Sequence, residues 1–138
     1  MARFVIDASA TLPWCFADEA TEWSESLLDR LRNGDQVTVP AHWAAEVSNG
    51  MLVALRKGRI QPGRPELFWD ELNILPIDVD PPLSSERAKS VLAVCSAHGL
   101  TVYDAVYLEL AKRKRLPIAS LDAELIKAAR NESVPVIS

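Results

Sequence analysis

Short runs of consecutive apolar residues alternate along the chain with longer segments in which apolar residues recur every three or four positions. The short runs are rich in valine and isoleucine, a composition typical of strands buried on both faces of a parallel sheet. They predict β-strands at residues 3–6, 36–39, 75–77, 117–119 and 134–137. Pro135 lies within the last run, which predicts that this strand lies at an edge of the sheet.

The longer segments have the spacing of amphipathic helices. They predict helices at residues 10–16, 21–32, 42–57, 65–72, 85–98, 102–114 and 123–130. Thr21 and either Ser84 or Ser85 are suitable N-caps, and Gly34 and Gly99 are suitable stops. Alternating strands and helices predict a parallel sheet covered by helices on both sides, so we expect one three-layer α/β/α domain over residues 1–138.

Composition limits the class of protein. The chain is 49% hydrophobic and 25% charged, as in globular domains, and no apolar run approaches the ~18 residues that cross a bilayer. No secretory signal pattern is visible at the start, and Cys15 and Cys95 are too far apart for a CxxC pair. We therefore expect a cytoplasmic protein with reduced thiols and no membrane association.

The net charge of −4 argues against a protein that coats nucleic acid through a broad basic surface. It does not argue against a nuclease, because carboxylates that hold cations at an active site make such an enzyme acidic. Evidence for a nuclease site therefore depends on the positions of individual acids in the sequence.

Two acids follow predicted strands. Asp7 ends the first strand, and Asp122 lies just beyond the fourth. Ligand sites of open parallel sheets gather at the carboxyl ends of the strands, so both are candidate ligands. The alternative for each is that it caps the helix that follows it.

Two further acids lie in apolar surroundings within predicted helices. Glu46 lies in "HWAAEVSNGMLVAL", which is apolar around nearly its whole circumference and predicts a largely buried helix. Asp104 shares a helical face with Leu108 and Ala111. The alternatives are that Glu46 reaches solvent or pairs with an arginine, and that Asp104 forms a capping box with Thr101.

These four acids could meet at one rim of the sheet. Crowded carboxylates repel one another, and their pKa values rise unless a cation neutralises them. Oxygen ligands favour Mg²⁺ or Mn²⁺ over zinc, and His42 and His98 are isolated, which is more typical of structural histidines. The pattern indicates a divalent-metal site.

The stretches "FVIDAS", "PAHWAAEVSN" and "LTVYDAVYLELAKRKRLPIASLDAEL" resemble the PIN-domain family, most closely the VapC-type ribonuclease toxins of bacterial toxin–antitoxin pairs. The resemblance covers essentially the whole chain and implies a five-stranded parallel α/β/α sandwich. It implies that Asp7, Glu46 and Asp104 are the three core acids and that Asp122 is the fourth. Residues at supporting positions of the family pattern are Ser9, Ser120 and Asn49.

The resemblance also implies a Mg²⁺-dependent endoribonuclease, with Mn²⁺ as a possible substitute. Asp7 and Asp104 would bind the metal directly, Glu46 and Asp122 would complete the cage, and metal-bound water would attack the phosphodiester. Ser9 would orient a ligand or a water. The candidate RNA contacts are two basic stretches: Arg56, Lys57 and Arg59, with Arg64 nearby, and Lys112, Arg113, Lys114 and Arg115. The alternative is that these residues form solvated faces at helix C-termini.

A toxin of this kind would be held by an antitoxin, and the resemblance implies a homodimer. Candidate residues for a partner groove, with core packing as the alternative, are Trp14, Phe16, Trp23, Phe68 and Trp69. Two alternative functions keep the fold: a nuclease of RNA maturation and a non-catalytic binding module. A phosphatase or phosphoryl-accepting switch fits less well, because Ser9 stands where the phosphatase class has a second Asp, and no Lys occurs at "PIASLD", where a switch needs one.

Overall fold

A four-stranded parallel sheet forms the centre of the computed structural model, which describes all 138 residues. Its strands are β1 (Arg3–Ile6), β2 (Gln36–Val39), β3 (Ile77–Val79) and β4 (Ile118–Ala119), in the order β3-β2-β1-β4. Val5 lies opposite Thr38 on one side and Ile118 on the other. The prediction of an α/β fold with a parallel sheet is confirmed.

The prediction of a fifth strand is wrong. Residues 134–137 contribute only an isolated parallel bridge between Val136 and Ile118. Pro135 has no amide hydrogen to donate, although its carbonyl accepts from the Ile118 amide at 2.9 Å. The third strand also begins later than predicted, because Leu75 and Pro76 belong to a turn in which the Ile77 amide bonds to the Leu75 carbonyl.

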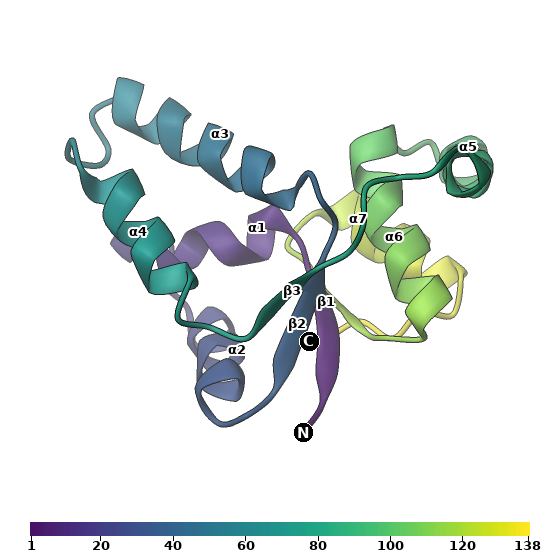
Figure 1. The fold of residues 1–138 in the computed structure, drawn as a ribbon, viewed down its shortest axis with the longest axis horizontal. Coiled ribbons are helices and arrows are strands. Elements are labelled where there is room, and N and C mark those ends of the chain that lie inside the picture. Colours follow the sequence, from purple (N-terminus) through teal and green to yellow (C-terminus); the bar gives the residue numbers. More distant parts are fainter.

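Seven α-helices and two short 3₁₀ helices surround the sheet. Figure 1 shows α1–α4 on one side of the strands and α5–α7 on the other, which gives the three layers expected. The α-helices are α1 (Ala8–Thr11), α2 (Glu22–Arg32), α3 (Trp43–Arg56), α4 (Arg64–Leu72), α5 (Ser85–His98), α6 (Val102–Lys114) and α7 (Ala123–Asn131). The 3₁₀ helices are Leu12–Trp14 and Ala17–Glu19.

The helix boundaries follow local signals in the sequence. Thr21 and Ser84 cap α2 and α5 by accepting from backbone amides, and Gly99 ends α5 with a left-handed φ of 67°. The predicted helix at 10–16 instead begins at Ala8 and tightens to 3₁₀ geometry at Leu12–Trp14, the turn that contains Pro13.

The core is one cluster of 31 buried hydrophobic residues. Helix α6 lies deepest in it, since every residue from Ala105 to Ala111 is buried. No single helix is both long and apolar enough to cross a membrane; α5 and α6 pass that test only as a pair bent by 110°.

Helix α3 departs from its prediction. Only one face of it is buried, formed by Trp43, Val47, Met51 and Ala54. Leu52 and Val53 are 39% and 42% exposed, so the helix is not surrounded by protein as the apolar sequence indicates. Glu46 consequently lies at the edge of the core instead of inside it.

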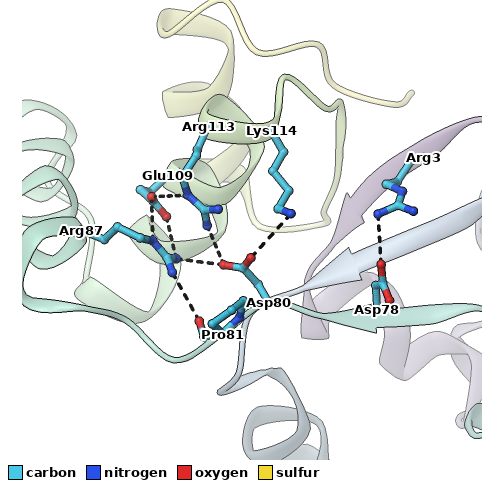
Figure 2. A network of polar contacts seen from close by, with 8 residues as sticks. All are labelled: Arg3, Asp78, Asp80, Pro81, Arg87, Glu109, Arg113 and Lys114. Atoms are coloured by element: carbon cyan, nitrogen blue, oxygen red, sulfur yellow. Dashed lines mark hydrogen bonds and ion pairs between the residues drawn. The ribbon is translucent and has the colours of Figure 1, made fainter.

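A buried network of charges ties β3 to α5 and α6, as Figure 2 shows. The Asp80 carboxylate, whose side chain is 1% exposed, lies 3.0 Å from Arg87 and 2.5 Å from Arg113. Both arginines also donate to Glu109 of α6. Burial alone would raise the pKa of Glu109, but the bonds from Arg87 and Arg113 hold that pKa below its ordinary value.

Replacing Arg87 with methionine tests how far this network stabilises the fold. The change keeps an apolar stem but leaves two buried carboxylates with fewer partners, and we expect a loss of about 3 kcal/mol in unfolding free energy. Urea unfolding monitored by circular dichroism measures it. Lys89→Met on the same helix removes an exposed pair with Glu86 and should cost less than about 1 kcal/mol. Equal losses in the two variants would contradict the prediction.

Candidate functional site

Asp7 is a buried acid at the carboxyl end of β1. Its residue is only 4% exposed, and its amide donates to the Ala119 carbonyl of β4 at 3.2 Å. Its Oδ1 accepts from the Ala10 amide at 3.0 Å and so caps α1. The capping alternative is therefore correct, and the remaining contacts of this carboxylate decide whether it is also available to a ligand.

Two serines, whose hydroxyl oxygens lie 3.4 Å apart, hold the two oxygens of the Asp7 carboxylate. Ser9 donates to Oδ1 at 2.7 Å, and Ser120 donates to Oδ2 at 2.6 Å. Each hydroxyl in turn accepts from an amide of the segment after β4, Ser9 from Leu121 and Ser120 from Asp122. Oδ1 thus has two donors and Oδ2 has one, which leaves a lone pair of Oδ2 free for a cation.

The electrostatics of Asp7 are unfavourable in the absence of a cation. Burial raises the pKa of Asp7 from its ordinary 3.8 to about 6, against the lowering effect of its bonds from Ser120, Ser9 and Ala10. The nearby Asp122 carboxylate raises it further. At neutral pH the side chain is therefore ionised at a cost to the folded state.

Glu46 is held at one oxygen only. The Tyr107 hydroxyl donates to Oε1 at 2.6 Å, and Nε2 of His42 lies 3.3 Å from the same atom. Burial, and then the Glu46 carboxylate, raise the pKa of Tyr107, so its hydroxyl remains a donor. The Glu46 side chain is 32% exposed and pairs with no arginine, which confirms that it reaches solvent.

Asp104 and Asp122 begin α6 and α7. The Thr101 hydroxyl caps α6 by accepting from the Asp104 amide, and Asp122 caps α7 by accepting from the Leu125 amide at 2.9 Å. Burial raises the pKa of Asp104, and the carboxylates of Asp122 and Glu46 raise it further. Asp122 therefore acts on both Asp7 and Asp104, which places all four acids in one electrostatic neighbourhood.

The four acids of this neighbourhood offer carboxylate oxygens, which suit Mg²⁺ or Mn²⁺. No three Asp, Glu, His or Cys side chains lie close enough together to hold one metal ion jointly. Mg²⁺ in proteins commonly keeps several waters and uses only one or two carboxylates. The second lone pair of Asp7 Oδ2 and the Oε2 of Glu46 are not engaged by protein donors, and they are oxygens of the type that a hydrated ion binds.

The family model of the PIN domain matches residues 4–131. The chain belongs to the PIN domain family. It is 26% identical to Ribonuclease VapC3 of Pyrobaculum aerophilum over 127 residues, which is 89% of this chain and 92% of the relative. The resemblance inferred from the sequence motifs is thereby confirmed.

Solved structures agree on the fold. The crystal structure of PAE2754 from Pyrobaculum aerophilum has a TM-score of 0.69 at 23% identity and covers 92% of this chain and 79% of its own. A toxin-antitoxin complex from Klebsiella pneumoniae has a TM-score of 0.59 at 16% identity, with 86% of each chain covered. At these identities the likeness establishes the PIN fold alone.

One of the two basic stretches of this PIN domain is largely engaged in ion pairs. Lys112 pairs with Glu132. Arg113 pairs with Asp80 and Glu109, and Lys114 lies 3.9 Å from Asp80 (Figure 2). These residues remain predicted RNA contacts, but their side chains also neutralise acids of the protein.

Only some residues of the other basic stretch form ion pairs. Arg59 pairs with Asp18 and Glu19 and lies over the Phe16 ring, and Arg64 pairs with Glu71. The remaining predicted cations are exposed and make no ion pair: Arg56, Lys57 and Arg115. Asn49, predicted as a supporting residue, is exposed one turn after Glu46.

Sequence reasoning missed the two residues that hold Glu46. His42 is predicted to be structural because it is isolated in the sequence, and Tyr107 is not among the predicted site residues. His42 lies four residues before Glu46 on a helical spacing, which is the local signal for their contact. Tyr107 is 61 residues from Glu46, and no pattern in the sequence links the two.

The raised pKa of Asp7 predicts how stability depends on pH. In metal-free buffer the Asp7 carboxyl keeps its proton up to about pH 6 in the folded protein, whereas in the unfolded chain it loses that proton near pH 3.8. Stability relative to Asp7→Asn should therefore fall as pH rises from about 4 to about 6 and then level off, by about 3 kcal/mol in total.

Chemical denaturation across that pH range, with chelator present, measures the difference. Asp70→Asn on α4 is the matched control, since it removes one exposed acid without touching the sheet rim. A difference between wild type and Asp7→Asn that stays constant over this range would show that burial does not perturb Asp7.

Proposed function

We propose that this PIN domain, residues 1–138, is a metal-dependent endoribonuclease that serves as the toxin of a toxin–antitoxin pair in the cytoplasm. The observation that carries the proposal is the buried Asp7 carboxylate, which two serines orient and which shares a repulsive neighbourhood with Asp104 and Asp122. The relative named Ribonuclease VapC3 supports the nuclease, and the toxin-antitoxin complex of the same fold supports the toxin.

An ionised Asp7 is an unfavourable group for a purely structural position. A carboxylate with a pKa near 6 reduces the stability of the folded protein at neutral pH, and a structural role would be filled as well by a neutral side chain. Perturbed acids of this kind are concentrated at functional sites. A bound cation would offset the repulsion among the acids, which gives the cluster a reason to exist.

The proposed ligands are the four acids that match the PIN-family pattern. Asp7 and Asp104 would hold the ion directly, and Glu46 and Asp122 would complete its shell through water or a second ion. Mg²⁺, or Mn²⁺ in its place, would supply the polarisation of a phosphodiester oxygen and the activation of a water. Other side chains of the protein orient these acids. Ser9 and Ser120 hold Asp7, and Tyr107 and His42 hold Glu46.

The toxin role requires a partner surface, and one apolar groove suits it. A cavity of about 280 Å³ lies between α3, α4 and β3 and includes Trp43, Trp69 and Leu72 in its lining. Trp69 was among the residues expected at such a groove, whereas Phe68 is 2% exposed and belongs to the core. We propose this groove for an antitoxin segment; a homodimer rests on the family resemblance alone.

Substitution of the proposed ligands tests the nuclease. Asp7→Asn and Asp104→Asn should each lower Mg²⁺-dependent cleavage of a structured RNA pool by at least about a hundredfold, because each removes a charged ligand. Mapping of cut ends, with Mn²⁺ and with chelator, measures it, and Asp70→Asn should cleave like the wild type. Undiminished cleavage in both ligand variants would refute the assignment.

Expression in a bacterial host separates a toxin from a nuclease of RNA maturation. A toxin should arrest growth, and the arrest should disappear in the Asp7→Asn variant and on co-expression of its antitoxin. Growth curves and viable counts measure the effect. Normal growth with active wild-type enzyme present would favour the maturation alternative.

A further inference from the structure

An exposed aromatic side chain stands beside the acidic neighbourhood. Tyr103 directly precedes Asp104 at the start of α6 and is 65% exposed. Its neighbour Val102 is 39% exposed, and Leu121, which precedes Asp122, is 54% exposed. Apolar groups do not bind a cation, so these exposed side chains beside the acids suit a different kind of ligand.

His42 holds Tyr103 in place. Nε2 of His42 lies 3.0 Å from the Tyr103 carbonyl oxygen, and the two rings pack with centroids 5.8 Å apart. The His42 ring also packs edge-on against Tyr107 at 5.2 Å, and the Tyr107 hydroxyl bonds to Glu46. A continuous series of contacts therefore fixes the exposed ring relative to an acid of the proposed metal site.

Ion pairs within the protein reduce the number of cations that are available to a nucleic acid. The net charge is −4, and most of the second basic stretch is paired with acids of the protein, namely Asp80, Glu109 and Glu132. A protein with few free cations can still hold single-stranded RNA by stacking its bases on aromatic side chains. Tyr103 is the exposed aromatic ring at the rim of the site.

We propose that Tyr103 is a stacking platform for an unpaired base of the RNA substrate, next to the phosphate that is cleaved. The inference rests on the proposed function and extends it to the substrate: the RNA must present an unpaired base at the cut. His42 is the positioning residue that supports the platform. Because every base has a flat face, Tyr103 contributes affinity for a single strand more than a choice of base.

Binding of a fluorescently labelled single-stranded RNA tests the proposal. All variants carry Asp7→Asn, so that the RNA stays intact, and anisotropy gives the dissociation constant in Mg²⁺. Tyr103→Ala should weaken binding about 5- to 100-fold, whereas Tyr103→Phe, which keeps the ring, should stay within about twofold. Leu92→Ala, at a position 58% exposed on α5, is the matched control and should bind like the parent.

An abasic RNA distinguishes stacking from a general disturbance of the fold. Removing the stacked base should weaken binding to the parent as much as Tyr103→Ala does, and the alanine variant should bind both RNAs equally. If the affinity loss from the abasic RNA and the loss from Tyr103→Ala were additive when combined, the proposal would be overturned. So would unchanged RNA affinity in Tyr103→Ala, the result expected if the ring serves a protein partner.

The two hypotheses fail in different ways. Retained cleavage in the Asp7 and Asp104 variants removes the proposed function, while an affinity loss in Tyr103→Ala that the abasic RNA reproduces would still support stacking. Normal metal-dependent cleavage with the same Michaelis constant in Tyr103→Ala and wild type removes the platform and leaves the nuclease intact.

Discussion

The position of the candidate site depends on one buried carboxylate. Asp7 ends β1, caps α1 and accepts from two hydroxyls, so the strand, the first helix and the segment after β4 all meet at its two oxygens. Ser9 and Ser120 are themselves bonded to the amides of Leu121 and Asp122. The orientation of the Asp122 backbone thus depends on the same group that Asp122 repels through its charge.

Helix α6 is fixed at both ends by different chemistry. Toward its C-terminus, Glu109 and Arg113 join the ion network of Asp80 and Arg87, and toward its N-terminus Tyr107 bonds to Glu46. The same network occupies Arg113, a predicted RNA contact, whereas the predicted contacts Arg56, Lys57 and Arg115 are exposed and make no ion pair.

The sequence predicts the parts of the structure that depend on local order. Apolar runs located four strands, and acids at strand ends located Asp7 and Asp122, because both signals lie within a few residues. Prediction from the sequence fails where the structure depends on contacts between residues that are far apart along the chain. The pairing of Arg113 with Asp80 spans 33 residues and that of Tyr107 with Glu46 spans 61, and the exposure of one face of α3 depends on which elements pack against it.

Capping and metal binding are compatible roles for the acids that begin helices. A cap needs one carboxylate oxygen, which Asp7 provides with Oδ1 and Asp122 with Oδ1, and the second oxygen of each can face another group. A helix N-terminus also favours a negative charge, which lowers the cost of keeping these acids ionised near one another. The helix starts therefore help to hold together carboxylates that would otherwise repel, so a capping role for Asp7 or Asp122 is no argument against the proposal that it also binds a metal.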